Sequence, residues 1–185
     1  MGRVVVTPEQ FRLVLFDAAH IASVVEQVAG KVGLGDGEIR VEVDEAVPLG
    51  RVRVTSLAPV TLAVQGGAFE DPKRPRRMSD RAIVDAVGRA LFRVRDRLDP
   101  GFGAPPADSD LSLQQSTAWD ANAVGRCDRA GLAPSKARRL YHFRNRHGFN
   151  DIADRVFERL WAADGLTWGD IERACQETAG ARQPV

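Results

Sequence analysis

Three ionisable residues have the types that acid–base chemistry on an anionic substrate would need. Asp120 falls within an apolar stripe of the helix expected over residues 110–130, and Arg144 falls within another over 135–147. Because burying an unpaired charge costs several kcal/mol, we expect Asp120 and Arg144 to pair across a helix interface. His147, one turn beyond Arg144, is placed to join them.

Two interpretations of this group remain open. In the first, the ion pair is structural and fixes the register of two helices. In the second, it forms the floor of a pocket, with Asp120 as base or orienting group, Arg144 as anion anchor and His147 or His142 as acid–base group. The strongest catalytic motifs, such as a phosphate-binding loop or a His-Glu-x-x-His helix, are absent. The sequence therefore leaves enzymatic activity open and favours a protein without it.

The cysteines and histidines predict neither a disulfide framework nor a metal site. Cys127 and Cys175 are the two cysteines, and the histidines His142 and His147 are five residues apart, too far around a helix to chelate from one face. We expect no cofactor. Few cysteines, an N-terminus unlike a signal peptide and no long apolar run together predict a cytoplasmic protein without a membrane partner.

The net charge of +1 conceals two basic blocks. Residues 72–99 and residues 126–159 each carry nine Lys or Arg and four Asp or Glu. The first block supplies a candidate anion-binding strip along a loop and the helix after it. Its members are Arg74, Arg76, Arg77, Arg89, Arg93 and Arg97. The competing interpretation is a solvated face whose arginines pair with neighbouring acids.

The second candidate anion-binding surface lies on the helix expected over 135–147. Its members are Arg138, Arg139, His142 and Arg146. Helical spacing places these four on one outward face, where guanidinium groups can fork onto phosphates or carboxylates. Tyr141 and Phe143 are expected to turn elsewhere, so stacking on nucleic-acid bases is not predicted. Ordinary surface solvation is again the alternative.

The elements that must position these residues predict an α+β fold. We expect an N-terminal helix from Thr7 to about Gly30, a three-stranded antiparallel meander and a second helix, followed by a four-helix C-terminal half. The strands are expected at 38–45, 51–55 and 60–64, and the helices at 79–98, 110–130, 135–147, 151–163 and 168–178. The Pro- and Gly-rich stretch 99–109 predicts a boundary between residues 1–99 and 108–180, which can also pack as one domain.

These patterns favour a cytosolic, non-catalytic protein that engages an anionic partner through its Arg-rich helices. The partner would be a nucleic acid, a phosphorylated ligand or an acidic protein surface. The alternative is a small enzyme acting on an anionic metabolite near Asp120, Arg144 and His147. Leu13, Phe16 and Phe92 lie on the less apolar sides of their expected helices, which predicts a homodimer if nothing else covers them.

Overall fold

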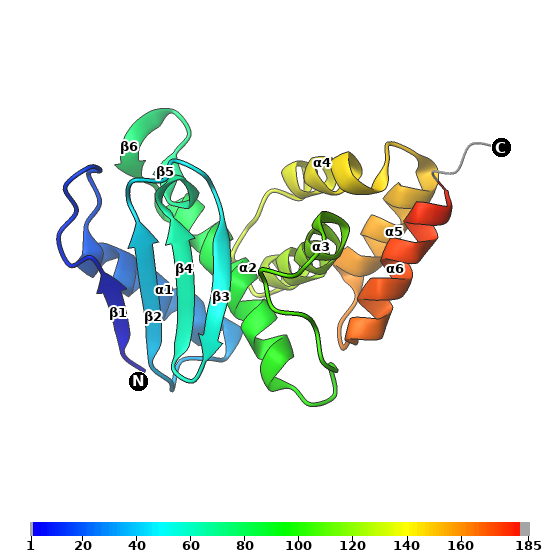
Figure 1. Ribbon diagram of the computed structural model, residues 1–185, viewed down its shortest axis with the longest axis horizontal. Coiled ribbons are helices and arrows are strands. Elements are labelled where there is room, and N and C mark those ends of the chain that lie inside the picture. Colours follow the sequence, from blue (N-terminus) through cyan, green and yellow to red (C-terminus); the bar gives the residue numbers. More distant parts are fainter. Residues whose placement is uncertain (1, 182–185) are drawn as a thin grey trace. The chain divides into compact units, whose positions relative to one another are not determined.

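The computed structural model describes residues 2–181 and confirms the α+β class (Figure 1). The chain divides into two compact units, one up to Arg95 and the other from Asp96. This division falls inside helix α2 (Asp80–Leu98), just before the Pro- and Gly-rich stretch where the sequence placed it.

The first unit contains a four-stranded mixed sheet. Its strands are β1 (Val4–Thr7), β2 (Ile39–Asp44), β3 (Val52–Leu57) and β4 (Val60–Gln65), in the order β1-β2-β4-β3. The pairs β1–β2 and β2–β4 are parallel, and only β3–β4 is antiparallel. The expected antiparallel meander is therefore corrected to a mixed sheet in which β4 lies between β2 and β3.

The position of β4 follows from its side chains. Val60 to Gln65 contains no charged residue, whereas β2 and β3 each contain Arg, Asp or Glu. A strand hydrogen-bonded on both edges and buried on much of its surface suits such a sequence. Short connections predicted that each of the three expected strands would pair with the next along the chain, which holds for β3 with β4 but not for β2 with β3.

The N-terminal residues form a strand and a loop where we predicted the start of a helix. Val4, Val5, Val6 and Thr7 are β-branched, which favours the extended backbone of β1. Helix α1 (Ala18–Val32) begins later, where the Asp17 carboxylate accepts a hydrogen bond from His20 N at 3.1 Å. The parallel β1–β2 pair requires a crossover connection, and α1 supplies it.

The predicted dimer patch also changes with this correction. Leu13 lies in the loop before α1 and is exposed, as is Leu15. Phe16 is half-buried and Phe92 is buried, so neither belongs to an exposed helix face.

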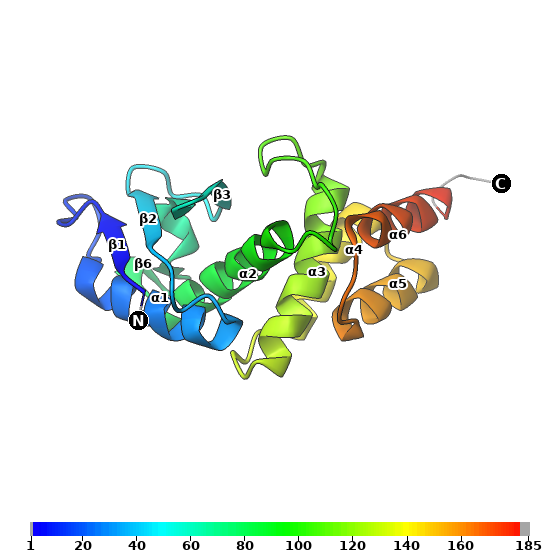
Figure 2. The ribbon, with the colours of Figure 1, turned by 90° about the horizontal axis from the view of Figure 1, so that it is seen from below.

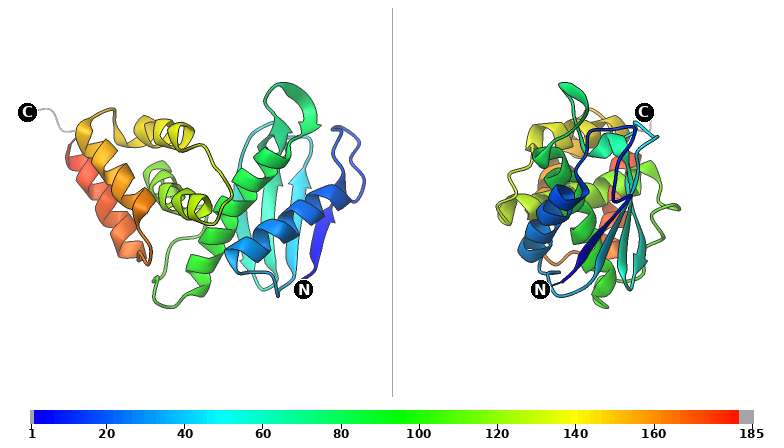
Figure 3. Two further views of the ribbon diagram at one scale, coloured as in Figure 1. Left: turned by 180° about the vertical axis from the view of Figure 1, so that it is seen from behind. Right: turned by 90° about the vertical axis from the view of Figure 1, so that its left-hand side faces the viewer.

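Helices α1 and α2 lie on the same face of the sheet (Figure 3). Alternate strand residues such as Val41 and Leu62 are fully buried, together with Ile21 of α1 and Leu91 of α2. The remaining strand positions point to the opposite face, which no described helix of this unit covers. That face carries the polar side chains of β2 and β3.

A short hairpin lies where we expected only a loop before the helix at 79–98. After a 3-10 turn, η1 (Gly66–Ala68), strands β5 (Glu70–Asp71) and β6 (Arg74–Met78) pair in antiparallel orientation. Arg and Pro in β6 are poor indicators of a strand. The turn between β5 and β6 is stabilised by Asp71, whose carboxylate accepts a hydrogen bond from Lys73 N at 2.8 Å.

The second unit contains the four predicted helices (Figure 2). They are α3 (Leu113–Arg129), α4 (Lys136–His147), α5 (Asp151–Ala162) and α6 (Trp168–Gly180). The fully buried Trp119 ring packs against Phe102 and Trp168, with centroid distances of 5.2 and 5.4 Å. Within residues 2–181, no helix has both the length and the apolar character needed to span a bilayer.

Candidate anion-binding surface

The predicted pairing of Asp120 with Arg144 is wrong. Asp120 is 6% exposed, as expected, but its carboxylate faces Arg139, with 3.6 Å between Oδ2 and Nη1. Arg144 instead binds Asp154 of α5 at two points, with distances of 2.7 and 2.6 Å. The buried face of α4 contains Arg139, Phe143 and His147, which are spaced four residues apart.

His147 serves the packing of the second unit. It is 1% exposed and its ring stacks on Phe143, with the centroids 3.9 Å apart. Nδ1 lies 2.7 Å from the hydroxyl of Thr178, and Nε2 lies 3.1 Å from that of Thr117. Both ring nitrogens are thus engaged by the protein, and the ring is shielded from water.

The three candidate catalytic residues consequently have separate environments. Asp120 and His147 are buried with protein partners, and Arg144 is engaged by Asp154. A substrate pocket would require these groups to converge on a shared space, and the pairing that was to form its floor is not made.

The arginines of the hairpin are exposed, but all three make contacts that hold the local structure. Arg74 pairs with Asp71 at 2.8 Å. Arg76 has a left-handed backbone, with φ of 63°, and its carbonyl accepts a hydrogen bond from Leu15 N at 2.7 Å. Arg77 bridges to Leu15 through the backbone. The hairpin arginines are therefore exposed, but their backbone or side chains are also used to hold the hairpin in place.

The expected ridge of arginines on α2 is not exposed along its length. Arg93 is 6% exposed and Arg89 is half-buried. Arg97 pairs with Asp108 at 2.8 Å and stacks over the Trp119 ring, 4.5 Å from its centroid. The Arg97 guanidinium is thus used in packing and ion pairing within the second unit and does not extend the candidate anion-binding strip.

Helix α4 carries more basic side chains than acidic residues of neighbouring helices neutralise. Residues 136–147 contain five Lys or Arg and no Asp or Glu. Three are neutralised by acidic residues of neighbouring helices, as Lys136–Glu158, Arg139–Asp120 and Arg144–Asp154. Across residues 2–181, no ion pair is formed by Arg138 or Arg146, and both side chains are exposed.

Exposed aromatic rings lie among these cations. Tyr141 is 59% exposed, and Phe149, just after the helix, is 65% exposed. Their rings meet edge to face at 6.2 Å, and Tyr141 lies at the same distance from the His142 ring. Our expectation that Tyr141 turns away from the outward face is therefore wrong. The sequence signal was available, because Tyr141 lies between the exposed positions 138 and 145 on the helix surface.

We call this surface the α4 outer face. It comprises Arg138, Tyr141, His142, Asn145, Arg146 and Phe149, all exposed. Arg139, which the sequence assigned to it, points inward. Arg138 and Arg146 are eight residues apart, which at 1.5 Å per residue is about 12 Å along the helix axis. Arg138 and Arg146, with the Tyr141 ring between them and the Phe149 ring beyond Arg146, can bind an extended polyanion.

No protein family, curated protein or solved structure matches this chain. Its own geometry therefore supplies the argument for function.

The two cysteines are free thiols that lie in buried or half-buried positions. Cys127 is 2% exposed, and burial raises the pKa of Cys175 to about 11, so the Cys175 thiol stays protonated at neutral pH. Between residues 2 and 181, no group of three or more His, Cys, Asp or Glu side chains is arranged to hold a metal ion.

Proposed function

We propose that this protein is a non-catalytic binding protein whose α4 outer face engages an anionic partner, and that the partner is single-stranded nucleic acid. The observation that carries the proposal is the exposed pair Arg138 and Arg146 beside Tyr141 and Phe149. Guanidinium groups bind phosphates, and exposed aromatic rings stack on unpaired bases.

The distribution of charge supports an anionic partner. Acidic residues of α3 and α5 pair with Lys136, Arg139 and Arg144 of α4. Within residues 2–181, Arg138 and Arg146 on the α4 outer face remain as unneutralised positive charges. His142, also exposed, lies between the two arginines along the helix and adds a side chain that can hydrogen-bond to phosphate.

The aromatic rings favour single strands over the other anionic partners. A duplex presents its phosphates but keeps its bases stacked, so Tyr141 and Phe149 would gain little from it. An acidic protein surface or a phosphorylated small ligand would use the arginines, but it has no need of two exposed rings in that position.

Binding is tested by fluorescence anisotropy with a labelled oligouridylate and a labelled duplex of the same length. We expect the single strand to bind more tightly than the duplex. The double variant Arg138→Gln, Arg146→Gln should weaken binding at least about tenfold, since each charged contact contributes about 1.5–3 kcal/mol. Tyr141→Ala should weaken it by about fivefold to a hundredfold, given about 1–3 kcal/mol per stacked base.

A charge-matched control is Arg12→Gln with Arg81→Gln, which removes two exposed arginines from the first unit. This control should bind like the unmodified protein. If both double variants lose affinity equally, the binding is diffuse and the proposal is wrong. Equal binding of duplex and single strand, or tight binding of polyglutamate instead, would replace it with one of the other anionic partners.

Self-association is a separate prediction. Leu13 and Leu15 are 55% and 68% exposed in the loop before α1, and a homodimer would cover them. Light scattering of the unmodified protein and of Leu13→Ser with Leu15→Ser checks it; a monomer at high concentration contradicts it.

A further inference from the structure

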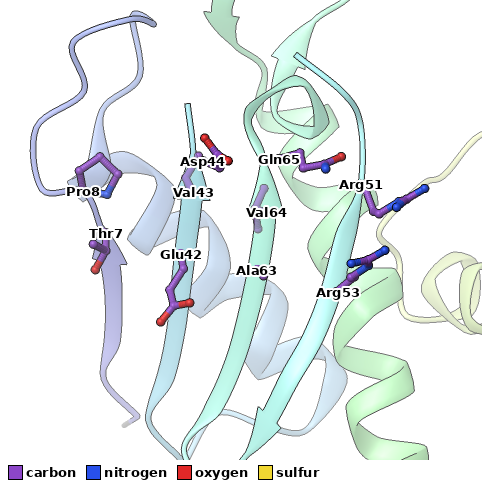
Figure 4. Close-up of a pocket in the computed structure, with 10 residues that line it drawn as sticks. All are labelled: Thr7, Pro8, Glu42, Val43, Asp44, Arg51, Arg53, Ala63, Val64 and Gln65. Atoms are coloured by element: carbon purple, nitrogen blue, oxygen red, sulfur yellow. The ribbon is translucent and has the colours of Figure 1, made fainter. Parts of the chain in front are cut away.

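The uncovered face of the four-stranded sheet contains a pocket of about 440 Å³ (Figure 4). The side chains on which the argument depends are Glu42, Asp44, Arg51, Arg53, Ala63 and Gln65. This pocket belongs to the first unit and does not involve the α4 outer face. Its volume is in the range of small-molecule sites.

Opposite charges line the two sides of the pocket. Glu42 pairs with Ala63 in the β2–β4 register, and Ala63 pairs with Arg53 in the β4–β3 register. These three residues thus form one row across the sheet, with a carboxylate at one end and a guanidinium at the other. Neighbouring strands are about 4.8 Å apart, so the backbones of Glu42 and Arg53 are about 10 Å apart.

A second row repeats the arrangement. Asp44 pairs with Gln65 across β2 and β4, and Gln65 N donates a hydrogen bond to Arg51 O at 2.9 Å. Figure 4 shows the two carboxylates on the β2 side and the two guanidinium groups on the β3 side. The pocket therefore has an acidic wall and a basic wall that carry equal formal charge.

The charges do not neutralise one another across the pocket. Within residues 2–181, Glu42, Arg51 and Arg53 form no ion pair, while the Asp44 carboxylate accepts a hydrogen bond only from Ala46 N, at 3.1 Å. The small side chain of Ala63 leaves room between the two walls. A ligand lying over Ala63 with a cation toward β2 and an anion toward β3 would complement both walls.

Gln65 adds a requirement for a hydrogen-bond donor. Its side-chain oxygen Oε1 is buried and has no hydrogen-bond partner. A buried acceptor without a donor costs free energy, and the terminal amide torsion of Gln is broad enough to turn this oxygen toward the pocket. A ligand with an amide N–H between its charged ends would satisfy it.

We propose that this pocket binds a short zwitterionic peptide, with its ammonium group against Glu42 and Asp44 and its carboxylate against Arg51 and Arg53. A dipeptide supplies the two terminal charges and one amide N–H, and it fits the pocket volume. A nucleotide would place phosphate near an acidic wall, and a polyamine would place ammonium groups near a basic one.

The test uses the full chain and isothermal titration calorimetry with the dipeptides Ala-Leu and Gly-Phe. Each is compared with its N-acetylated form, which lacks the cation, and its C-amidated form, which lacks the anion. We expect saturable binding of the free dipeptides and at least a tenfold loss on either modification.

The variants assign each peptide end to its wall. Glu42→Gln should weaken binding of the free dipeptide about tenfold and leave the weaker binding of the acetylated form unchanged, because both changes remove the same contact. Arg53→Gln should behave in the same way toward amidation. Ala63→Leu should abolish binding by filling the space between the walls.

Arg40→Gln is the matched control, because Arg40 is an exposed arginine of β2 that does not line the pocket and pairs with Glu38. It should leave dipeptide affinity unchanged. The proposal is overturned if neither dipeptide binds, if capping either end has no effect, or if Arg40→Gln weakens binding as much as Arg53→Gln does. None of these outcomes depends on nucleic-acid binding by α4.

Discussion

Oδ2 of Asp120 in α3 lies 3.6 Å from Nη1 of Arg139 in α4, and both side chains are buried. Removing one partner of a buried ion pair strands the other charge away from water. Asp120→Ala should therefore lower the free energy of unfolding of the second unit by about 3–5 kcal/mol. Chemical denaturation followed by Trp fluorescence measures this change.

The controls for that prediction are a second ion pair made by α4 and the double variant of the Asp120–Arg139 pair itself. Arg144→Ala, which removes the half-buried partner of Asp154, should cost less than Asp120→Ala, because the Arg144–Asp154 pair remains in contact with water. The double variant Asp120→Leu, Arg139→Met should cost less than the sum of the single changes. Additive effects would mean that Asp120 and Arg139 do not interact.

The Asp120 result shows how far the sequence alone could be used. A charged residue in an apolar stripe correctly predicted burial of Asp120 and a cationic partner on α4. It did not identify that partner, because the side of α4 expected to be buried was the one that carries Tyr141. The side that is buried carries Arg139, Phe143 and His147. An arginine on the polar side of a helical wheel can still bury its long aliphatic stem against the neighbouring helix, and Arg139 does so.

Local signals at the helix ends were more reliable than the pairing of strands. Asn150 and Thr167, which directly precede the helices expected at 151–163 and 168–178, are residue types that favour N-caps, and each accepts the corresponding backbone hydrogen bond. Thr7, also a favourable N-cap residue, was the expected start of the N-terminal helix but ends β1, since the run of Val before it favours a strand. The parallel pairing of β2 with β4 is non-local, and no local pattern specifies it.

Gly125 allows α3 and α5 to approach closely. A Cβ at this position would lie 2.1 Å from the carbonyl oxygen of Trp161, which is backbone and cannot move aside cheaply. Gly125→Ala should therefore destabilise the second unit by about 1–3 kcal/mol or more. Gly169→Ala in α6, where the new Cβ meets only ordinary contacts, should be neutral or slightly stabilising. Equal thermal stability of the two variants would contradict this packing.

The Arg144–Asp154 pair predicts a specific response to acid. Hydrogen bonds from the Arg144 guanidinium hold the pKa of Asp154 below its ordinary value of 3.8. A lowered carboxyl pKa contributes stability above the unfolded-state value, and this contribution is lost as the pH falls through the folded-state value. Carboxyl NMR titration should show a lowered pKa in the unmodified protein and a return toward 3.8 in Arg144→Gln. An unchanged titration would show that the pair is not formed in solution.

Cys175 should be an unreactive thiol. Burial raises its pKa to about 11, against 9.0 for an ordinary cysteine. The smaller thiolate fraction, partly offset by the higher nucleophilicity of a more basic thiolate, predicts alkylation about tenfold slower than that of a free cysteine at pH near 8. Iodoacetamide labelling followed by mass spectrometry checks the rate. Labelling of Cys175 as fast as free cysteine would reveal an exposed, reactive thiol.

The most direct test of nucleic-acid binding is the map of backbone amide NMR shifts when an oligouridylate is added to the labelled protein. The largest shifts should fall within residues 138–149, and Arg138→Gln with Arg146→Gln should remove them. Binding through two phosphates also predicts a slope of log affinity against log salt of about −1.4, or about a sevenfold loss between 50 and 200 mM salt. Shifts centred on the β5–β6 hairpin or on α2, or unchanged in the double variant, would contradict the assignment of binding to the α4 outer face.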